Sequence, residues 1–435
     1  MPAYEKMATS GTTTLRDAFS ARLIVSYVFD WALMVALVIG AYYLGQIQPN
    51  FRDFSLADRD ISFPFTEKET VPNWLLGALC AGVPVIVILV VALVFVPGAT
   101  VPPNTPAGLV WKRKLWELHI AWLGLLVSVG AAFFFVSGIK NMCGKPRPDM
   151  LARCMPDIKN KDMYQVGGFA TDGADGRLYS HLICTQTDKA KLWDGFRSYP
   201  SGHAGASAAG LIYLSLYLAS KFGVTIPFVV PNLNLINNKD SHSAFPSRAV
   251  TSSSYQSAAL RAGYEDDHRV QAKIADRAAR FNANVQSLRR QAAAPPVYLL
   301  AITLVPFCIS IFISASRWFN YRHHGFDILF GFLIGTICAI YTFRFYHMPI
   351  QTGAGWAWAP RNPSRAFWAG VGKLGFGNDR SANKNEQPDD SLLEEGREER
   401  RFEQSRTPVD RHPQPYTSQY QQHEVEMQTL QGQAI

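Results

Sequence analysis

The stretch from Trp74 to Pro97 reads WLLGALCAGVPVIVILVVALVFVP and contains no charged residue. A helix needs about 20 mainly apolar residues to cross about 30 Å of hydrocarbon, so this stretch is long enough to span a bilayer, with a kink at Pro84. Five further segments meet the same requirement, although the fourth in chain order is short and rich in Gly, Ala and Ser, as in helices packed closely against neighbours. The six predicted crossings are residues 23–45, 74–97, 118–139, 203–220, 296–315 and 326–346.

Length and composition agree with a membrane protein. Of the 435 residues, 48% are hydrophobic and only 17% are charged, and long stretches hold almost no Asp, Glu, Lys or Arg. Aromatic residues reach 12% and there are six cysteines, which excludes a collagen-like chain, a wholly disordered chain and a small disulfide scaffold. The sequence therefore predicts an all-α integral membrane protein with six transmembrane helices in a bundle.

The loop between the second and third predicted crossings indicates the orientation. It carries Lys112, Arg113 and Lys114, and short loops rich in Lys and Arg lie on the cytoplasmic side of a membrane. Residues 140–202 are then lumenal or extracellular, and residues 221–295 form a cytoplasmic insertion. The 140–202 loop is basic although it lies on the opposite side, which indicates another use for its charges.

Three parts of the chain differ in composition. Residues 1–22 are polar and form a cytoplasmic N-terminal segment, residues 23–346 form the membrane domain, and residues 347–435 form a cytoplasmic tail. The end of the tail, residues 377–435, is rich in Gln, Glu and Arg and poor in aliphatic residues, so it cannot bury enough apolar surface to fold alone. We expect the tail to be largely disordered.

Three short clusters of polar residues lie at the outer ends of predicted crossings. In the predicted topology all three meet on one face of the bilayer, although they are far apart in the sequence. Such convergence predicts a functional site. The clusters are Lys140 with Arg147-Pro148, then Pro200-Ser201-Gly202-His203, then Ser316-Arg317 with His323 and Asp327.

The residue types in these clusters suit a bound phosphate. Lys140, Arg147 and Arg317 supply positive charge and several N–H donors for tetrahedral oxygens. Ser201 begins a predicted helix, where its hydroxyl and the backbone N–H groups at the positive end of the helix dipole add further donors. Gly202 lets the backbone approach the anion closely. Together these residues predict an anion-binding cradle.

The two histidines add chemistry to the cradle. His323 and Asp327 are four residues apart, so on one helix they share a face and Asp327 accepts the imidazole N–H, which leaves the other nitrogen as a nucleophile. His203 is placed across the phosphate, where it protonates the departing oxygen. We therefore expect phosphoryl transfer through a phosphohistidine that water hydrolyses, with no metal and no cofactor, because the cations stabilise the transition state.

Alternatives remain for individual residues. His324 lies three residues before Asp327 and could also share a face with it, so His324 is a second candidate for the nucleophile. A metal site built from His203, His323 and Asp327 is a further alternative, because these residue types bind metals. The net charge of +8 is dispersed over cytoplasmic loops without a binding module, so we expect a lipid bilayer and no nucleic acid as partner.

Three of the six cysteines fall in the lumenal loop, where oxidising conditions allow a disulfide. They are Cys143, Cys154 and Cys184, and three thiols allow three pairings. A bridge between Cys154 and Cys184 would close a loop over the predicted site, and it is the pairing that we favour.

The three clusters resemble the signature of the type 2 phosphatidic acid phosphatases, also called lipid phosphate phosphatases. That signature is K-x6-RP, then PSGH, then SR-x5-H-x3-D, and every position of it is present here. The stretches GKPRPDMLARC and DGFRSYPSGH are most similar to the fungal diacylglycerol pyrophosphate and phosphatidate phosphatases. The resemblance covers about residues 20 to 346.

The resemblance implies a six-helix fold of the phosphatidic acid phosphatase and haloperoxidase type, and Mg²⁺-independent removal of phosphate from lipid phosphates. The family nucleophile falls on His323, its orienting acid on Asp327 and its general acid on His203. The family residues that hold phosphate correspond to Lys140, Arg147, Ser201, Gly202 and Arg317.

The expected substrates are phosphatidate, diacylglycerol pyrophosphate, lysophosphatidate or sphingoid phosphates, because all of them present a similar terminal phosphate to these motifs. Two other functions are alternatives. One is a lipid phosphotransferase in which a lipid hydroxyl receives the phosphoryl group, and the other is a catalytically silent lipid-binding scaffold. The intact His203, His323 and Asp327 argue against the scaffold.

Overall fold

The computed structural model of the protein describes residues 21–98, 101, 105–171, 174–225, 294–350, 355–367 and 376. Most of the predicted N-terminal segment, most of the predicted insertion and the end of the tail lie outside the described residues. The chain divides into two compact units, residues 1–363 and 364–435, and the helical bundle belongs to the first.

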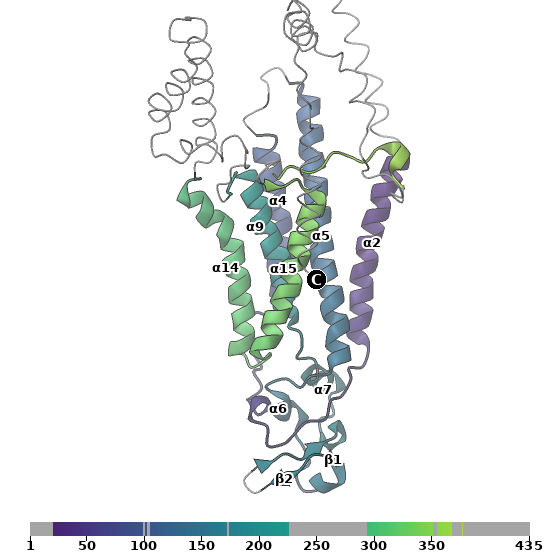
Figure 1. Cartoon of the computed structure of the whole chain (residues 1–435), viewed down its shortest axis with the longest axis vertical. Coiled ribbons are helices and arrows are strands. Elements are labelled where there is room, and N and C mark those ends of the chain that lie inside the picture. Colours follow the sequence, from purple (N-terminus) through teal and green to yellow (C-terminus); the bar gives the residue numbers. More distant parts are fainter. Residues whose placement is uncertain are drawn as a thin grey trace, which may run out of the picture. The chain divides into compact units, whose positions relative to one another are not determined.

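Five apolar helices of the described residues are long enough to cross a membrane, which makes this a multi-pass membrane protein. They run alongside one another in Figure 1. One of them consists of α3 (Asn73–Gly77), a π-helical segment η2 (Ala78–Gly82) and α4 (Val83–Phe95). The other four are α2 (Ala21–Gln46), α5 (Ala107–Cys143), α14 (Val297–Phe319) and α15 (Gly325–Tyr346).

The fourth predicted crossing differs from the others. It is helical from Gly202 to Lys221, through α8 (Gly202–Ser207), a π-helical segment η5 (Ala208–Ile212) and α9 (Tyr213–Lys221), but it is not among the five helices apolar enough to count as spans. Most of its residues are buried, and it contacts α4, α5, α14 and α15. The Gly, Ala and Ser content that lowers its hydropathy is what allows this central packing.

Helices α8 and α15 are held in close contact by glycines. A β-carbon at Gly331 would lie 2.3 Å from the carbonyl oxygen of Ser201, and one at Gly335 would lie 2.1 Å from that of Gly205. Only residues without a side chain permit this approach. As a result the first turns of the two helices are joined, because the backbone N–H of Ser201 donates to the carbonyl of Asp327 at 2.8 Å.

The two π-helical segments lie against each other. Pro84 has no N–H, so the carbonyl of Cys80 loses its usual helical donor four residues on, and the wider π turn compensates for that loss. Gly210 of η5 lies at this carbonyl, where a β-carbon would lie only 2.0 Å from the Cys80 oxygen. Where the sequence predicts a kink at Pro84, the structure has a π segment that packs against the central helix.

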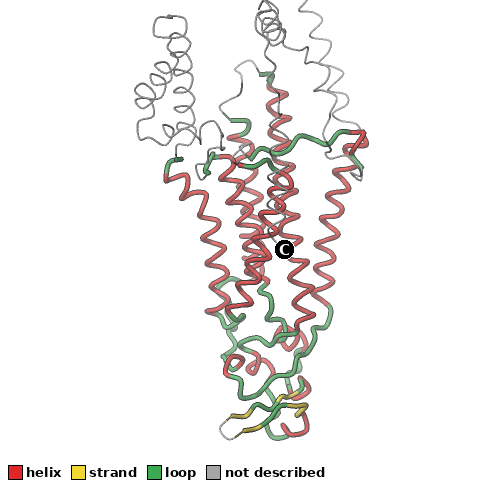
Figure 2. Tube along the Cα trace, in the orientation of Figure 1, coloured by secondary structure: helices red, strands yellow, loops and turns green. Residues whose placement is uncertain are grey.

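The segment between α5 and α8 forms a small extramembrane region beyond one end of the helices (Figure 2). It contains α6 (Met150–Cys154), α7 (Lys189–Gly195), the 3-10 turns η3 (Lys161–Tyr164) and η4 (His181–Ile183), and two antiparallel two-stranded sheets. The sheets pair β1 (Gln165–Gly167) with β4 (Leu178–Tyr179), and β2 (Ala170–Thr171) with β3 (Ala174–Asp175).

These strands correct the all-α prediction. They are short and contain no long period-2 pattern, and their pairing depends on a glycine at which the two chain segments approach closely. Gly168 has a left-handed φ of +81°, and a β-carbon there would lie 2.1 Å from the Gly176 oxygen. A disulfide joins Cys154 to Cys184 within this region.

At the opposite end of the bundle the chain after α15 is bound back to the helices. Glu117 of α5 is fully buried, and its carboxylate accepts from the Lys221 ammonium and, at 3.2 Å, from the backbone N–H of Ala357. Arg361 pairs with Asp30 of α2 at 2.6 Å. The segment from residue 355 to 361 thus connects α2, α5 and α9.

Candidate active site

In Figure 1 the ends of α5 and α14 and the start of α15 lie at the end of the bundle that carries the extramembrane region. The three sequence clusters come together there. Lys140 lies in the last turn of α5, Arg317 lies in the last turn of α14, and Asp327 lies in the first turn of α15. His203 follows the N-terminus of α8, whereas His323 lies in the turn between α14 and α15. Four helix ends and the turn between α14 and α15 therefore contribute to one site.

The three basic residues predicted to bind phosphate differ in the partners that they already have. A β-carbon at Gly202 would lie 3.3 Å from the Lys140 ammonium, and among the described residues this ammonium has no hydrogen-bond or ion-pair partner. Arg147 is buried and pairs with Asp194 at 2.7 Å, and its Nε has no partner among the described residues. Arg317 is only 1% exposed and pairs with Glu69 at 2.7 Å. Lys140 and Arg147 thus keep donors for a ligand.

The start of α8 contributes backbone donors. Ser201 is the N-cap, is fully buried, and accepts from the N–H of Ala204 through its hydroxyl oxygen at 3.4 Å. The N–H groups of Gly202 and His203 belong to the first turn, where no intrahelical acceptor exists. An anion beside Gly202 would therefore meet these N–H groups and the Lys140 ammonium together.

His323 is buried, at 2% exposure, and its orientation is determined by a backbone contact. Its Nδ1 atom lies 2.6 Å from the carbonyl oxygen of Ser198, so Nδ1 carries the proton and Nε2 keeps a lone pair. Burial, and then the positive charges of Arg147 and Lys140, lower the pKa of His323 well below its ordinary value. The imidazole is neutral at neutral pH, as a nucleophile must be.

The expected hydrogen bond between Asp327 and His323 is not present. The Asp327 carboxylate instead accepts from the Ser198 hydroxyl at 2.6 Å, the Lys145 ammonium at 2.8 Å and the backbone N–H of His324 at 3.1 Å. The reason is that α15 begins at Gly325, so His323 lies outside the helix and the four-residue spacing does not place it on the face of Asp327.

His324 occupies the position that was expected of His323. It is the N-cap of α15, its Nδ1 lies 3.1 Å from the Asp327 carboxylate, and its Nε2 lies 3.2 Å from the carbonyl oxygen of Asp60. Both ring nitrogens of His324 are thus engaged, whereas His323 keeps one nitrogen available.

His203 lies beside the cations, since the positive charges of Arg317 and Lys140 act on it. Its Nε2 atom lies 3.0 Å from the carbonyl oxygen of Val71, which also accepts from Arg317 at 3.2 Å. His203 and Arg317 therefore share a backbone acceptor from the segment that precedes α3.

Comparison with known proteins identifies the family of this chain. A model of the PAP2 superfamily matches residues 121–351, which is more than half of the chain and includes every predicted site residue. The chain belongs to the PAP2 superfamily. No solved structure matches this PAP2 protein.

Curated relatives of this PAP2 protein match most of its length. The probable diacylglycerol pyrophosphate phosphatase 1 of Schizosaccharomyces pombe is 28% identical over 325 residues, which cover 74% of this chain and 82% of that protein. The diacylglycerol pyrophosphate phosphatase 1 of Saccharomyces cerevisiae is 24% identical over 324 residues, which cover 74% of this chain and 80% of that protein. The probable lipid phosphate phosphatase 4 of Arabidopsis thaliana is 25% identical and covers 76% of each chain.

The PAP2 site contains a second layer of charges that the sequence analysis did not identify. Asp194 binds Arg147 and, at 2.9 Å, Arg153, which also binds the buried Asp149. Burial opposes ionisation of Asp194, but the nearby guanidinium groups outweigh it and lower its pKa to about 2. Asp149 and Arg153 are four residues apart after the RP pair, which is a signal for an ion pair on one helix face.

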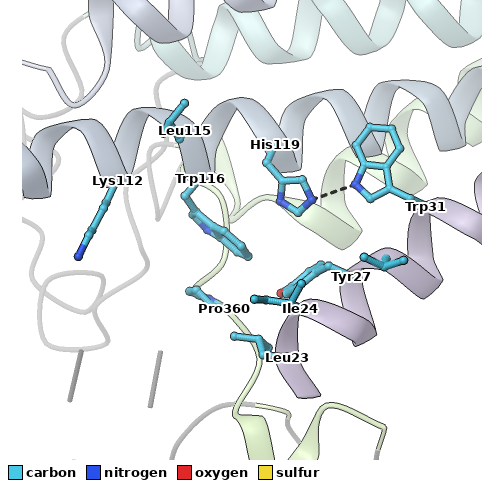
Figure 3. A pocket seen from close by; sticks show the side chains of 10 residues that line it. Leu23, Ile24, Tyr27, Trp31, Lys112, Leu115, Trp116, His119 and Pro360 are labelled. Carbon is cyan, nitrogen blue, oxygen red and sulfur yellow. Dashed lines mark hydrogen bonds between the residues drawn. The ribbon is translucent and has the colours of Figure 1, made fainter. Parts of the chain in front are cut away.

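A separate pocket lies between α2 and α5 of this PAP2 protein (Figure 3). It has a volume of about 590 Å³ and is lined largely by apolar and aromatic side chains, including Tyr27, Trp31 and Trp116. Trp31 donates to His119 at 3.0 Å across it. His119 and Lys140 are both on α5 and 21 residues apart, or about 30 Å at the helical rise. This pocket is therefore distinct from the phosphate cradle.

The described residues contain no group of three or more His, Cys, Asp or Glu side chains arranged to hold a metal ion. In particular, His203, His323 and Asp327 do not form such a group. The histidines face cations and backbone carbonyls, as described above.

Proposed function

We propose that this PAP2 protein is a lipid phosphate phosphatase that acts on phosphatidate, diacylglycerol pyrophosphate or a related lipid phosphate without Mg²⁺. The names of its relatives and its family support a phosphoric monoester hydrolase. The observation that carries the mechanism is the contact of His323 Nδ1 with Ser198, which leaves a neutral, buried Nε2 beside Lys140 and Arg147.

The reaction proceeds in two steps, phosphoryl transfer to His323 and hydrolysis of the phosphohistidine. Lys140, Arg147, Arg317 and the N–H groups at Gly202 and His203 hold the phosphate oxygens and stabilise the charge of the transition state. In the first step Nε2 of His323 bonds to phosphorus while the bond to the lipid oxygen breaks, and His203 gives that oxygen a proton. In the second step His203 takes a proton from water, whose oxygen displaces His323 and releases inorganic phosphate.

The proposed topology has six crossings: the five apolar helices and, fourth in chain order, the helix Gly202–Lys221. The catalytic end is lumenal or extracellular, and residues 1–22, 221–295 and 347–435 are cytoplasmic, because Lys112 to Lys114 lie toward the other end of α5. The substrate approaches sideways with its acyl chains still in the bilayer. Protease added to sealed vesicles with the cytoplasmic face outward should cut the tail and spare residues 140–202, and cutting in that loop would invert the topology.

Phosphate release from short-chain phosphatidate by purified protein in detergent with excess EDTA tests the function. The wild type should release phosphate, His323→Ala should lower kcat by about three orders of magnitude or more, and His324→Ala is the matched control. His324→Ala should retain most of the turnover and lose about 1 kcal/mol of stability, because it removes a helix cap. The reverse order of the two variants would make His324 the nucleophile. Substrate loss without phosphate release would indicate transfer to a lipid hydroxyl.

A further inference from the structure

The segment before α3 places polar groups directly on the catalytic residues. The Glu69 carboxylate bridges two arginines, with one oxygen 2.7 Å from Nη1 of Arg317 and the other 2.8 Å from Nη2 of Arg322. Two residues later, the carbonyl of Val71 lies 3.0 Å from His203 Nε2 and 3.2 Å from Arg317 Nη2. Donors that are proposed to meet the substrate are therefore occupied by this segment.

A carboxylate oxygen and a phosphate oxygen make the same charge-assisted hydrogen bond to a guanidinium. Arg317 is 1% exposed, whereas the Glu69 side chain is 24% exposed. Glu69 therefore lies on the more accessible side of a buried guanidinium. An anion that approaches Arg317 has to compete with this carboxylate.

Arg322 provides a place for the displaced carboxylate. Besides Glu69, Arg322 binds the backbone carbonyl of Thr66 at 3.1 Å. Arg322 is thus tied at a second point to the segment that carries Glu69. The side chain of Thr70 lies 3.1 Å from the side-chain amide of Asn320, and this contact anchors the backbone next to Glu69. Glu69 can leave Arg317 by a change of its side chain alone while its pairing with Arg322 is kept.

We propose that Glu69 occupies the anion site at Arg317 in the resting enzyme and that the substrate phosphate displaces it onto Arg322, which makes Glu69 a specificity-determining residue. This inference rests on the proposed role of Arg317 in holding phosphate. A terminal phosphomonoester carries a charge of about −1.5 to −2 at neutral pH and competes well with a carboxylate. A phosphodiester headgroup carries a single charge, so Glu69 disfavours the phosphodiester lipids that surround the enzyme.

The test is the affinity of the full-length protein in detergent for inorganic phosphate, measured by titration calorimetry. Glu69→Gln removes the competing charge with little change of shape, and should bind phosphate about tenfold more tightly, which corresponds to about 1.4 kcal/mol. Glu67→Gln is the matched control, because Glu67 is an exposed acid of the same loop that has no hydrogen bond or ion pair with the described residues. This variant should bind phosphate as the wild type does. Dioctanoyl phosphatidylglycerol, a phosphodiester probe, should inhibit the release of phosphate from short-chain phosphatidate more strongly in Glu69→Gln than in the wild type.

Each result decides the inference. Unchanged or weaker phosphate binding by Glu69→Gln would overturn it, since Glu69 would then only position Arg317. Failure of every protein, wild type included, to bind phosphate would overturn the proposed function and this inference with it.

A measurement on the wild type covers the case in which Glu69→Gln does not fold. A water-soluble carbodiimide with an amine labels accessible carboxylates, and peptide mass spectrometry reports the labelled positions. Saturating phosphate should increase labelling of Glu69 at least about threefold relative to Glu67, because phosphate releases the carboxylate from one of its two arginines. Unchanged or reduced labelling of Glu69 would overturn the proposal.

Discussion

His323 is oriented by Ser198 and not by Asp327, which follows His323 by four residues in the sequence. The carbonyl oxygen of Ser198 lies 2.6 Å from Nδ1 of His323, and the hydroxyl of the same residue lies 2.6 Å from the Asp327 carboxylate. Asp327 is therefore linked to the imidazole only through Ser198. This arrangement makes Ser198 a positioning residue for the proposed nucleophile.

Loss of the Ser198 hydroxyl should lower kcat while leaving KM nearly unchanged. Ser198→Ala keeps the backbone carbonyl that orients His323 but removes the connection to Asp327, so we expect a decrease in kcat of about tenfold. Steady-state kinetics with short-chain phosphatidate measures this. Ser198→Thr keeps a hydroxyl and should recover part of the rate. Equal decreases of kcat in the two variants would show that the hydroxyl does not contribute to catalysis.

The lowered pKa of His323 predicts activity in mildly acidic solution. Only the neutral imidazole attacks phosphorus, so activity is retained above the lowered pKa and is lost as the pH falls through it. The profile of kcat/KM against pH, corrected for the second ionisation of the substrate phosphate near pH 6, should show no loss from this histidine at its ordinary value of 6.5. A required basic group that titrates at or above 6.5 would contradict the site geometry.

Removal of the disulfide should destabilise the extramembrane region. Cys154 and Cys184 are 30 residues apart, and a loop of this size corresponds to about 3 to 4 kcal/mol of stabilisation. Replacing both by Ser should lower the unfolding temperature of the purified protein, as should a reducing agent. Cys143→Ser is the control, because Cys143 is a free thiol, and a similar loss in this variant would show that the bridge is not the cause.

The close contact between α8 and α15 should not tolerate a single methyl group. Gly335→Ala places a β-carbon 2.1 Å from the Gly205 oxygen, so the helices must separate, at a cost of about 1 to 3 kcal/mol. Activity should fall as well, because the hydrogen bond between Ser201 and Asp327 depends on this contact. Gly77→Ala has open space around its β-carbon and should be neutral or stabilising by about 0.5 to 1 kcal/mol. Unfolding measurements on both variants decide the matter.

The sequence predicted the features that are local and failed on the short strands and on the start of one helix. The apolar crossings agree with the observed helices within a few residues, except that α5 begins at Ala107 and not near 118, because its polar first turns remain helical beyond the apolar part. The pairing of Asp327 with His323 requires α15 to begin near His323. The helix begins two residues later, at Gly325, so that His324 pairs with Asp327 instead.

The acids of the site were harder to predict than its cations. Lys140, Arg147 and Arg317 belong to motifs with recognisable spacing, whereas Glu69 is 248 residues from Arg317 in a loop without periodicity. Asp194 lies only a few residues before PSGH, but its role is visible only once α7 brings it to Arg147. Long-range ion pairs of this kind have no pattern in a single sequence.

The contact of Ala357 with Glu117 also determines how far the chain can be shortened for purification. A truncated form that ends after Arg361 keeps the donors of Glu117 and the pair between Arg361 and Asp30. A form that ends before Gly355 removes a backbone donor from a fully buried carboxylate and an acceptor from Lys221. Although every proposed catalytic residue precedes that point, trimming should therefore stop beyond residue 361.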